Sequence, residues 1–256
     1  MDIIIFIAIA FVLVYTLYKA KVFKLTGVSI VLLILLLAVK FGAGQIINKY
    51  YFDRYENQQH SDIYKYFDDG HELYKIAKEN PTAYVKIFSG LYQNDSSLDQ
   101  YVNRLSNWKK HTDNYVKTMN YTDANLFSSN RTMARINSLL CFASQGNLMS
   151  QTLMFSFISF LGITLIFLTF LSNLKLPPWL SFSALCCSPS LLIWSSSIQK
   201  ESLLVFGIGL FVYAVFRKNK NYLLLVLACI LLLYTAYFIL VILIGSWILV
   251  MIYQKS

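Results

Sequence analysis

The sequence predicts an all-α fold: a polytopic transmembrane helix bundle with a helical extracytoplasmic domain between the second and third spans. Three observations lead to this prediction. The composition is 57% hydrophobic and only 14% charged, whereas a soluble domain carries about 25% charged residues. Apolar runs, each near the roughly 20 residues that cross a bilayer, flank a polar segment at 48–150. Basic residues outnumber acidic ones outside that segment, which is typical of cytoplasmic loops.

The apolar runs fall on both sides of the polar segment. Residues 1–47 contain two, Ile3–Tyr18 and Val28–Ile47, and we expect Lys40 in the second to snorkel toward water. Residues 151–256 contain four or five more, taken from the runs Thr152–Leu171, Trp179–Ile198, Ser202–Phe216 and Tyr222–Tyr253.

The run from Tyr222 to Tyr253 is too long for one upright helix. At 1.5 Å per residue it would measure about 47 Å, against about 30 Å of hydrocarbon. It forms either one strongly tilted helix or two short helices that meet near Tyr234–Tyr237, and we favour two helices.

Lysine and arginine in the short loops predict the orientation. The loops assigned to the cytoplasm contain Lys19, Lys21, Lys24, Lys175, Arg217, Lys218 and Lys220. Twelve basic and eleven acidic residues between Lys49 and Arg135 give the polar segment a net charge of +1, and it then lies outside. The remaining ten basic and two acidic residues predict contact with anionic membrane lipids rather than nucleic acid. Many Lys, Asn, Ile, Tyr and Phe residues favour a bacterial source, and we expect the chain in the inner (plasma) membrane.

Apolar spacing predicts three helices in the polar segment. The first covers Asp62–Lys78 and ends at Asn80–Pro81. The second covers 98–108. The third covers Ser129–Phe142, ends before Gln145–Asn147, and is expected to lie along the membrane surface ahead of the third span.

The cysteines and histidines predict neither a zinc site nor a disulfide framework. No CxxC or HExxH spacing occurs, and the cysteines lie in apolar surroundings, where they serve as small buried side chains. They are Cys141, Cys186, Cys187 and Cys229.

The first candidate site is an acidic cluster with neighbouring histidines. Carboxylates just outside a membrane can act as a general base toward a sugar or lipid acceptor, or hold a divalent cation. The alternative is a solvated helix face. The cluster comprises Asp62, Asp68, Asp69, Glu72, His60 and His71.

Two further candidates contain basic residues. Arg131 and Arg135 are four apart and share a helix face, where guanidinium groups can clamp a lipid phosphate; snorkelling to anionic lipid is the alternative. Lys200 and Glu201 follow a serine-rich stretch after Pro189, which breaks or bends the fourth apolar run. A pair that caps a loop between helices is the alternative there.

In this order, the motifs resemble those of membrane-embedded C-type glycosyltransferases, in particular the bacterial relatives of protein mannosyltransferases. The motifs are Asp62-x-Tyr64-x-Tyr66-Phe67-x-Asp69-Gly70, Asn130-Arg131-x-x-x-Arg135 and Pro189-Ser190-x-x-x-Trp194-Ser195-Ser196-x-x-x-Lys200-Glu201. The resemblance covers about residues 60–220. An additional apolar segment precedes the acidic loop, and the chain is shorter than is usual for that family. We expect a shortened relative, a fragment, or a chain that works with a partner.

The resemblance implies transfer of a sugar from a polyprenyl-phosphate carrier at the outer face of the membrane, for a cell-envelope glycan or glycoprotein. It implies a catalytic carboxylate at Asp62 or Asp69. It also implies contacts to the carrier phosphate from Arg131, Arg135 or Lys200, with Glu201 beside Lys200 as a further substrate-binding residue. The competing hypothesis is a non-catalytic membrane subunit that assembles with other envelope proteins. A transporter is disfavoured because the later spans hold almost no ionisable residues.

Overall fold

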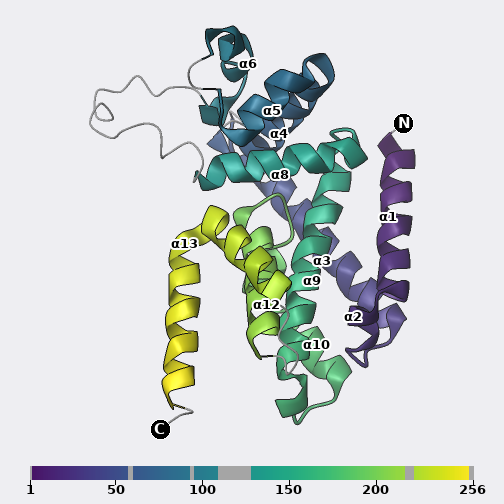
Figure 1. Ribbon diagram of the computed structural model, residues 1–256. Coiled ribbons are helices and arrows are strands. Elements are labelled where there is room, and N and C mark those ends of the chain that lie inside the picture. The colour runs from purple at the N-terminus through teal and green to yellow at the C-terminus, as the bar shows by residue number, and fades with distance from the viewer. Residues whose placement is uncertain (1, 57–59, 93–94, 109–127, 217–221, 254–256) are drawn as a thin grey trace.

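The computed structural model describes residues 2–56, 60–92, 95–108, 128–216 and 222–253 (Figure 1). The described residues form helices and no strand, which confirms the all-α prediction. Among them, four helices are long and apolar enough to cross a membrane. These are α1 (Asp2–Lys19), α3 (Ile30–Arg54), α9 (Leu148–Phe170) with its 3-10 extension η5 (Leu171–Asn173), and α13 (Tyr222–Tyr253).

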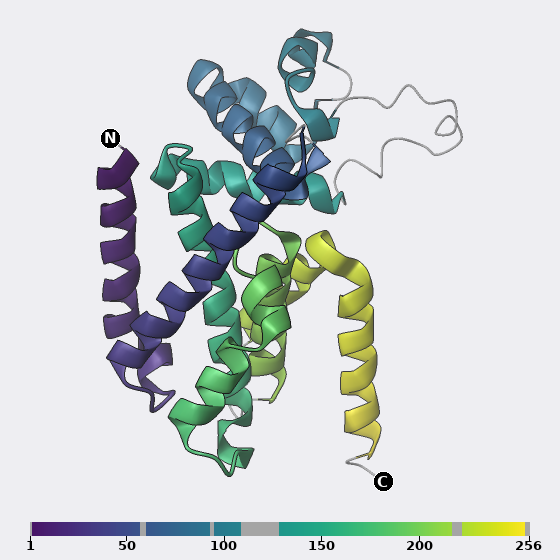
Figure 2. The ribbon, with the colours of Figure 1, turned by 180° about the vertical axis from the view of Figure 1, so that it is seen from behind.

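The polar helices gather at one end of the long axis (Figures 1 and 2). This polar end consists of α4 (Asp62–Glu79), α5 (Pro81–Ser89) and α8 (Ser129–Ser144). The chain starts there, descends through α1 to the short helix α2 (Lys21–Lys24), and returns through α3. Helix α9 then leads back to the opposite end, which contains two lysines in α2 and which we call the basic end.

Helix α4 forms as predicted. Asn80 ends it, and the Asn80 side chain accepts a 3.0 Å hydrogen bond from the backbone N–H of Ala83, so the same residue caps α5. The single helix predicted over 98–108 is wrong. Three short pieces replace it: η2 (Ser96–Leu98), α6 (Asp99–Val102) and η3 (Ser106–Trp108).

Helix α8 has the predicted bounds within two residues but not the predicted surroundings. It lies between α4 and the long helices, so half of its residues are buried and the helix does not lie free along a membrane surface. Gly70 of α4 permits the close approach: a Cβ there would lie 2.6 Å from Asn137 Nδ2. After α8, Gln145 and Gly146 adopt left-handed backbone angles, and Asn147 caps α9.

The predicted span Trp179–Ile198 is not one helix. It consists of α10 (Pro178–Cys186) and α11 (Pro189–Trp194), followed by a non-helical stretch at 195–199 and then α12 (Lys200–Phe216). Pro189 lacks the N–H that would continue α10, so it starts a new helix at its own N1 position. We refer to 195–199 as the serine stretch; every residue in it is buried.

One stripe of α3 supports the serine stretch. Lys40, Gly44 and Asn48 recur every four residues, so they share a helix face. Lys40 does not snorkel: it is fully buried, and Nζ donates to the carbonyl of Leu191 at 2.9 Å and to Ser195 Oγ at 2.8 Å. Leu191 belongs to the last turn of α11, whose carbonyls lack helical partners, so the ammonium acts as a C-cap.

A stripe of α9 supports the stretch from the other side. Ser159 Oγ donates to the carbonyl of Ser195 at 2.5 Å, and Ser156 Oγ donates to the carbonyl of Ser196 at 2.7 Å. Thr152, one turn earlier, accepts a 2.8 Å hydrogen bond from Asn48 Nδ2. Side chains thus satisfy backbone carbonyls that no helix satisfies.

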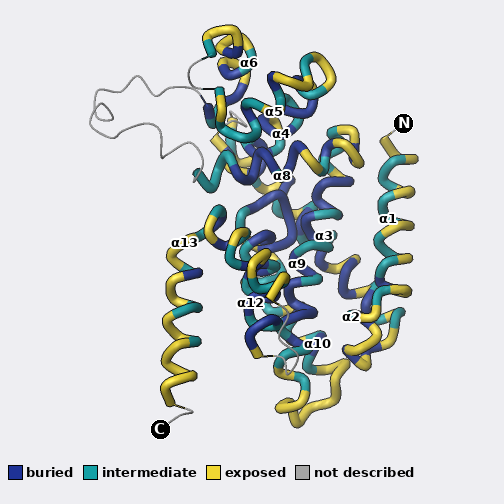
Figure 3. The backbone as a smooth tube through the Cα atoms, viewed as in Figure 1, coloured by how far each residue is buried: buried dark blue, intermediate teal, exposed yellow. Residues whose placement is uncertain are grey.

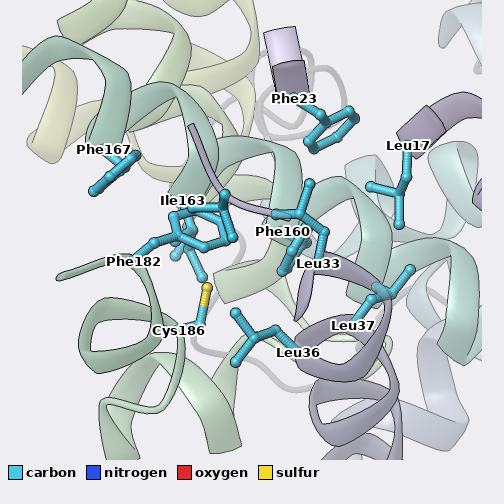
Figure 4. Close-up of a cluster of buried hydrophobic side chains, with 12 residues drawn as sticks. Leu17, Phe23, Leu33, Leu36, Leu37, Phe160, Ile163, Phe167, Phe182 and Cys186 are labelled. Atoms are coloured by element: carbon cyan, nitrogen blue, oxygen red, sulfur yellow. The ribbon is translucent and has the colours of Figure 1, made fainter. Parts of the chain in front are cut away.

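Apolar packing completes the bundle. Phe182 of α10 contacts the rings of Phe160 and Phe167 of α9, with centroids 5.6 and 5.0 Å away (Figure 4). Gly162 of α9 and Gly209 of α12 let the two backbones touch: a Cβ on Gly209 would lie 2.4 Å from the Gly162 carbonyl oxygen. Helix α9 is therefore buried along most of its length, whereas α1 is largely exposed (Figure 3).

Helix α13 changes direction at Ala236, where φ is −158° and ψ is 74°. Its first part packs along α12, and its second part turns back toward the basic end with an exposed apolar surface (Figures 1 and 3). The prediction of two short helices meeting near Tyr234–Tyr237 is confirmed.

Two glycines of α3 provide a matched test of this packing. A Cβ on Gly44 would lie 2.1 Å from the Ser196 carbonyl oxygen, whereas a Cβ on Gly42 would meet nothing within 4 Å. We expect Gly44→Ala to lower the free energy of unfolding by about 3 kcal/mol through overpacking. Gly42→Ala should leave it unchanged or raise it by up to about 1 kcal/mol. Thermal unfolding in detergent measures both, and equal effects would contradict the contact.

Candidate functional site

A polar cavity of about 290 Å³ lies where the polar end meets the long helices. Four chain segments form it: the end of α3, the start of α4, the end of α11 and the start of α12. The lining residues are Tyr51, Tyr55, His60, Asp62, Ile63, Tyr66, Trp194, Gln199, Lys200 and Glu201.

The start of α4 contributes the acidic side of the cavity. Asp62 is the first residue of the helix, where a carboxylate is stabilised by the helix dipole, and its side chain is exposed. Tyr66 lies one turn later and is buried, and its hydroxyl donates a 2.9 Å hydrogen bond to Asn130 Oδ1. Burial, followed by the carboxylates of Asp62 and Glu201, raises the pKa of Tyr66, so the phenol stays neutral.

The start of α12 contributes the basic side. The Lys200 ammonium lies 5.7 Å from the centroid of the Tyr66 ring, a cation–π contact that joins the two sides. Glu201 follows at the exposed rim. Ser202 secures the helix start, because its backbone N–H and its hydroxyl bond to the carbonyls of Gln199 and Ser197.

Aromatic rings form the remaining wall. Tyr51 and Tyr55 stack in parallel, with centroids 5.8 Å apart and an interplanar angle of 4°. Trp194, at the end of α11, is 48% exposed. Sequence reasoning missed these three rings and Gln199 as site residues, because nothing in their local pattern indicates that four distant segments meet.

Of the six residues to which the resemblance assigns a role, Asp62, Lys200 and Glu201 line the cavity together, and His60 of the acidic cluster lines it too. The remaining three, Asp69, Arg131 and Arg135, do not. Asp69 is 2% exposed and its two carboxylate oxygens accept four hydrogen bonds of 2.6–2.9 Å from the backbone and side chains of Ser106 and Asn107. Asp69 therefore caps η3. Its hydrogen bonds to Ser106 and Asn107 explain why residues 98–108 do not form one helix.

Arg131 and Arg135 share a face as predicted, but they lie around Trp108 rather than in the cavity. Their guanidinium carbons are 5.4 and 5.8 Å from the Trp108 ring. Arg131 also donates to the carbonyl of Asn107 at 3.0 Å and to the hydroxyl of Tyr92 at 3.1 Å. Burial, and then the like charge of Arg131, lower the pKa of Arg135. Asp69 thus holds the segment on which both arginines pack.

The rest of the predicted acidic cluster is dispersed. Glu72 pairs with Lys75 and Arg104 on the surface, and the His71 ring lies beside those of Phe67 and Tyr74. Within the described part of the chain, no three His, Cys, Asp or Glu side chains are grouped closely enough to hold a metal ion.

A second cavity of about 650 Å³ is entirely different in character. It lies between α9, α12 and the first part of α13, and nearly all its lining is aliphatic or aromatic. It offers an environment for hydrocarbon, not for a reacting polar group. Of the two cavities, the polar one carries the functional groups.

Comparison with known proteins finds no matching family model, curated protein or solved structure.

Asp69 and its neighbour Asp68 provide a test of the capping role. Asp69→Ala leaves four partly buried donors of Ser106 and Asn107 without an acceptor, so we expect the free energy of unfolding to fall by about 3 kcal/mol. Asp68 is exposed, and Asp68→Ala should change it by less than about 1 kcal/mol. Unfolding in detergent, followed by circular dichroism, compares the two. A fall of similar size for both variants would refute the cap.

Proposed function

We propose that the chain is a multi-pass membrane glycosyltransferase that uses a polyprenyl-phosphate-linked sugar at the outer face of a bacterial inner membrane. One observation carries the proposal. Asp62, from the polar segment, and Lys200 and Glu201, from the start of α12, line one polar cavity where the polar helices meet the candidate spans. The family resemblance assigns a function to the motif that begins at Asp62 and to the motif that ends at Lys200–Glu201.

The distribution of charge supports the orientation. The basic end holds α2 and the turn 174–177, which contains Lys175, and short basic loops favour the cytoplasm. The polar end, and with it the cavity, then lies at the outer surface. A lipid carrier can place its phosphate at this level while its prenyl chain remains in hydrocarbon.

The groups present fit an inverting sugar transfer. The Asp62 carboxylate takes the proton of an acceptor hydroxyl as that oxygen bonds to the anomeric carbon. The bond from the anomeric carbon to the carrier phosphate breaks, and the phosphate leaves with the electron pair. The Lys200 ammonium stabilises the charge that develops on it. Glu201 and the tyrosines offer hydrogen bonds and flat apolar faces for the sugar.

Of the residues that the resemblance names as base or phosphate contact, the proposal uses Asp62 and Lys200. Because Asp69 is saturated by four hydrogen bonds, the base assigned is Asp62. Because Arg131 and Arg135 pack on Trp108 outside the cavity, the proposed step uses Lys200 alone as the cation.

A non-catalytic membrane subunit is the second candidate. The observation that favours it is the second part of α13, whose apolar residues are exposed beside the bundle, as a helix contacting another membrane protein would be. This candidate predicts co-purification with a partner and no transfer activity.

Transfer and binding in lipid nanodiscs distinguish the two. With polyprenyl-phosphate sugars as donors, Asp62→Asn should lower the rate of transfer by about 100-fold or more with little change in carrier binding. Lys200→Ala should weaken carrier binding by about tenfold. Exposed residues outside the cavity provide controls: Asp99→Asn and Lys175→Ala should match the wild type. Binding of polyprenyl phosphate no tighter than that of generic anionic lipid would refute the proposal.

A further inference from the structure

We infer that the apolar cavity between α9, α12 and the first part of α13 holds one acyl chain of an anionic phospholipid, whose phosphate contacts the lysines of α2 at the basic end. The inference goes beyond the proposed reaction, which uses the polar cavity, and it does not depend on that reaction.

The apolar cavity extends from the basic end to about the middle of the bundle. Val22 of α2 lines it at the basic end. On α12, which starts at the polar cavity, the lining runs from Phe206 to Tyr213, and on α13 it runs from Leu224 to Leu231. Seven residues of helix rise about 10 Å, which is within the roughly 15 Å depth of one leaflet. A chain that fills the cavity therefore comes from the leaflet at the basic end.

The walls of this cavity suit hydrocarbon and need a cover. Leu227 and Ile230 line it, yet they remain 47% and 49% exposed, so the cavity is open on the side of α13. Its volume of about 650 Å³ is within the roughly 300–1,000 Å³ of ligand pockets. Inside a bilayer, the group that meets such a surface is a lipid chain.

Charge at the end of the cavity identifies the headgroup as anionic. Val22 packs against the residues on both sides of the cavity, and the exposed Lys21 and Lys24 belong to the same short helix. Residues 3–52 and 202–256 contain no Asp or Glu, so α2, α12 and α13 supply no counter-charge there. Basic residues beside a pocket between membrane helices are suited to lipid phosphate.

Tyr18 marks the depth of the headgroup. Its ring is exposed, and it contacts two ammonium groups: Lys19 Nζ lies 5.4 Å and Lys24 Nζ lies 5.7 Å from the ring centroid. Tyrosine is enriched where hydrocarbon meets the headgroups. The lysines of α2 therefore lie at the level of the lipid phosphates.

Two phospholipids with the same acyl chains isolate the headgroup. Phosphatidylglycerol is anionic and phosphatidylcholine is zwitterionic, so native mass spectrometry of delipidated protein with each lipid in detergent reports the effect of charge. We expect the wild type to prefer phosphatidylglycerol by about tenfold or more. Lys21→Ala and Lys24→Ala should each weaken that binding by about fivefold and leave phosphatidylcholine binding unchanged. Lys175→Ala, at the same end, should bind both lipids like the wild type.

A second set of variants tests the acyl chain. Leu227→Trp places a larger side chain in the cavity, whereas Val226→Trp alters a neighbouring exposed residue that does not line it. We expect Leu227→Trp to weaken the binding of both lipids by about tenfold and Val226→Trp to weaken neither. If Leu227→Trp fails to fold, Ile230→Trp should give the same loss.

Two results would overturn the inference. Unchanged lipid binding in folded cavity variants would show that the chain lies elsewhere. Equal affinity of the wild type for the two lipids would remove the headgroup site. Because neither measurement involves sugar transfer, failure here leaves the proposed function standing.

Discussion

Backbone carbonyls that lie inside a helix bundle must find donors there, and the serine stretch 195–199 is where this protein meets that constraint. Every residue of the stretch is buried within the protein, so donors for its carbonyls come from other protein groups. Lys40 supplies them to the end of α11, and Ser156 and Ser159 supply them to the stretch itself. Gly44 contributes by its lack of a side chain, because any Cβ would collide with the Ser196 carbonyl. One face of α3 and one face of α9 therefore hold the serine stretch in place.

The break between α11 and α12 positions the site residues. If α11 continued as one helix, Gln199 and Lys200 would follow its direction. The break instead starts α12 beside α4, so that Lys200 reaches the Tyr66 ring and shares a cavity with Asp62. The arginines are organised separately, through the capture of η3 by Asp69. Lys200 and the pair Arg131 and Arg135 are therefore held by different contacts, and of these residues only Lys200 lines the cavity.

Local chemistry explains what could be predicted from sequence. Apolar run length identified the four long helices, although it also predicted one span at Trp179–Ile198 that is two short helices. Asn80–Pro81 marked the end of α4, and the length of the last run indicated its division at Ala236. The failures depend on tertiary contacts. Nothing near residues 98–108 shows that Asp69 will interrupt their helix. The burial of Lys40 depends on the distant Leu191 and Ser195, and the cavity's aromatic wall depends on four segments meeting.

The coupling between Lys40 and Ser195 tests the central claim most directly. A double-mutant cycle with Lys40→Ala, Ser195→Ala and the double variant, followed by unfolding in detergent, measures it. If the ammonium holds the serine stretch, the two losses overlap, and the coupling energy should be about 1–3 kcal/mol. Losses that add to within about 0.5 kcal/mol would contradict the account, because Lys40 would then stabilise the bundle independently of the stretch.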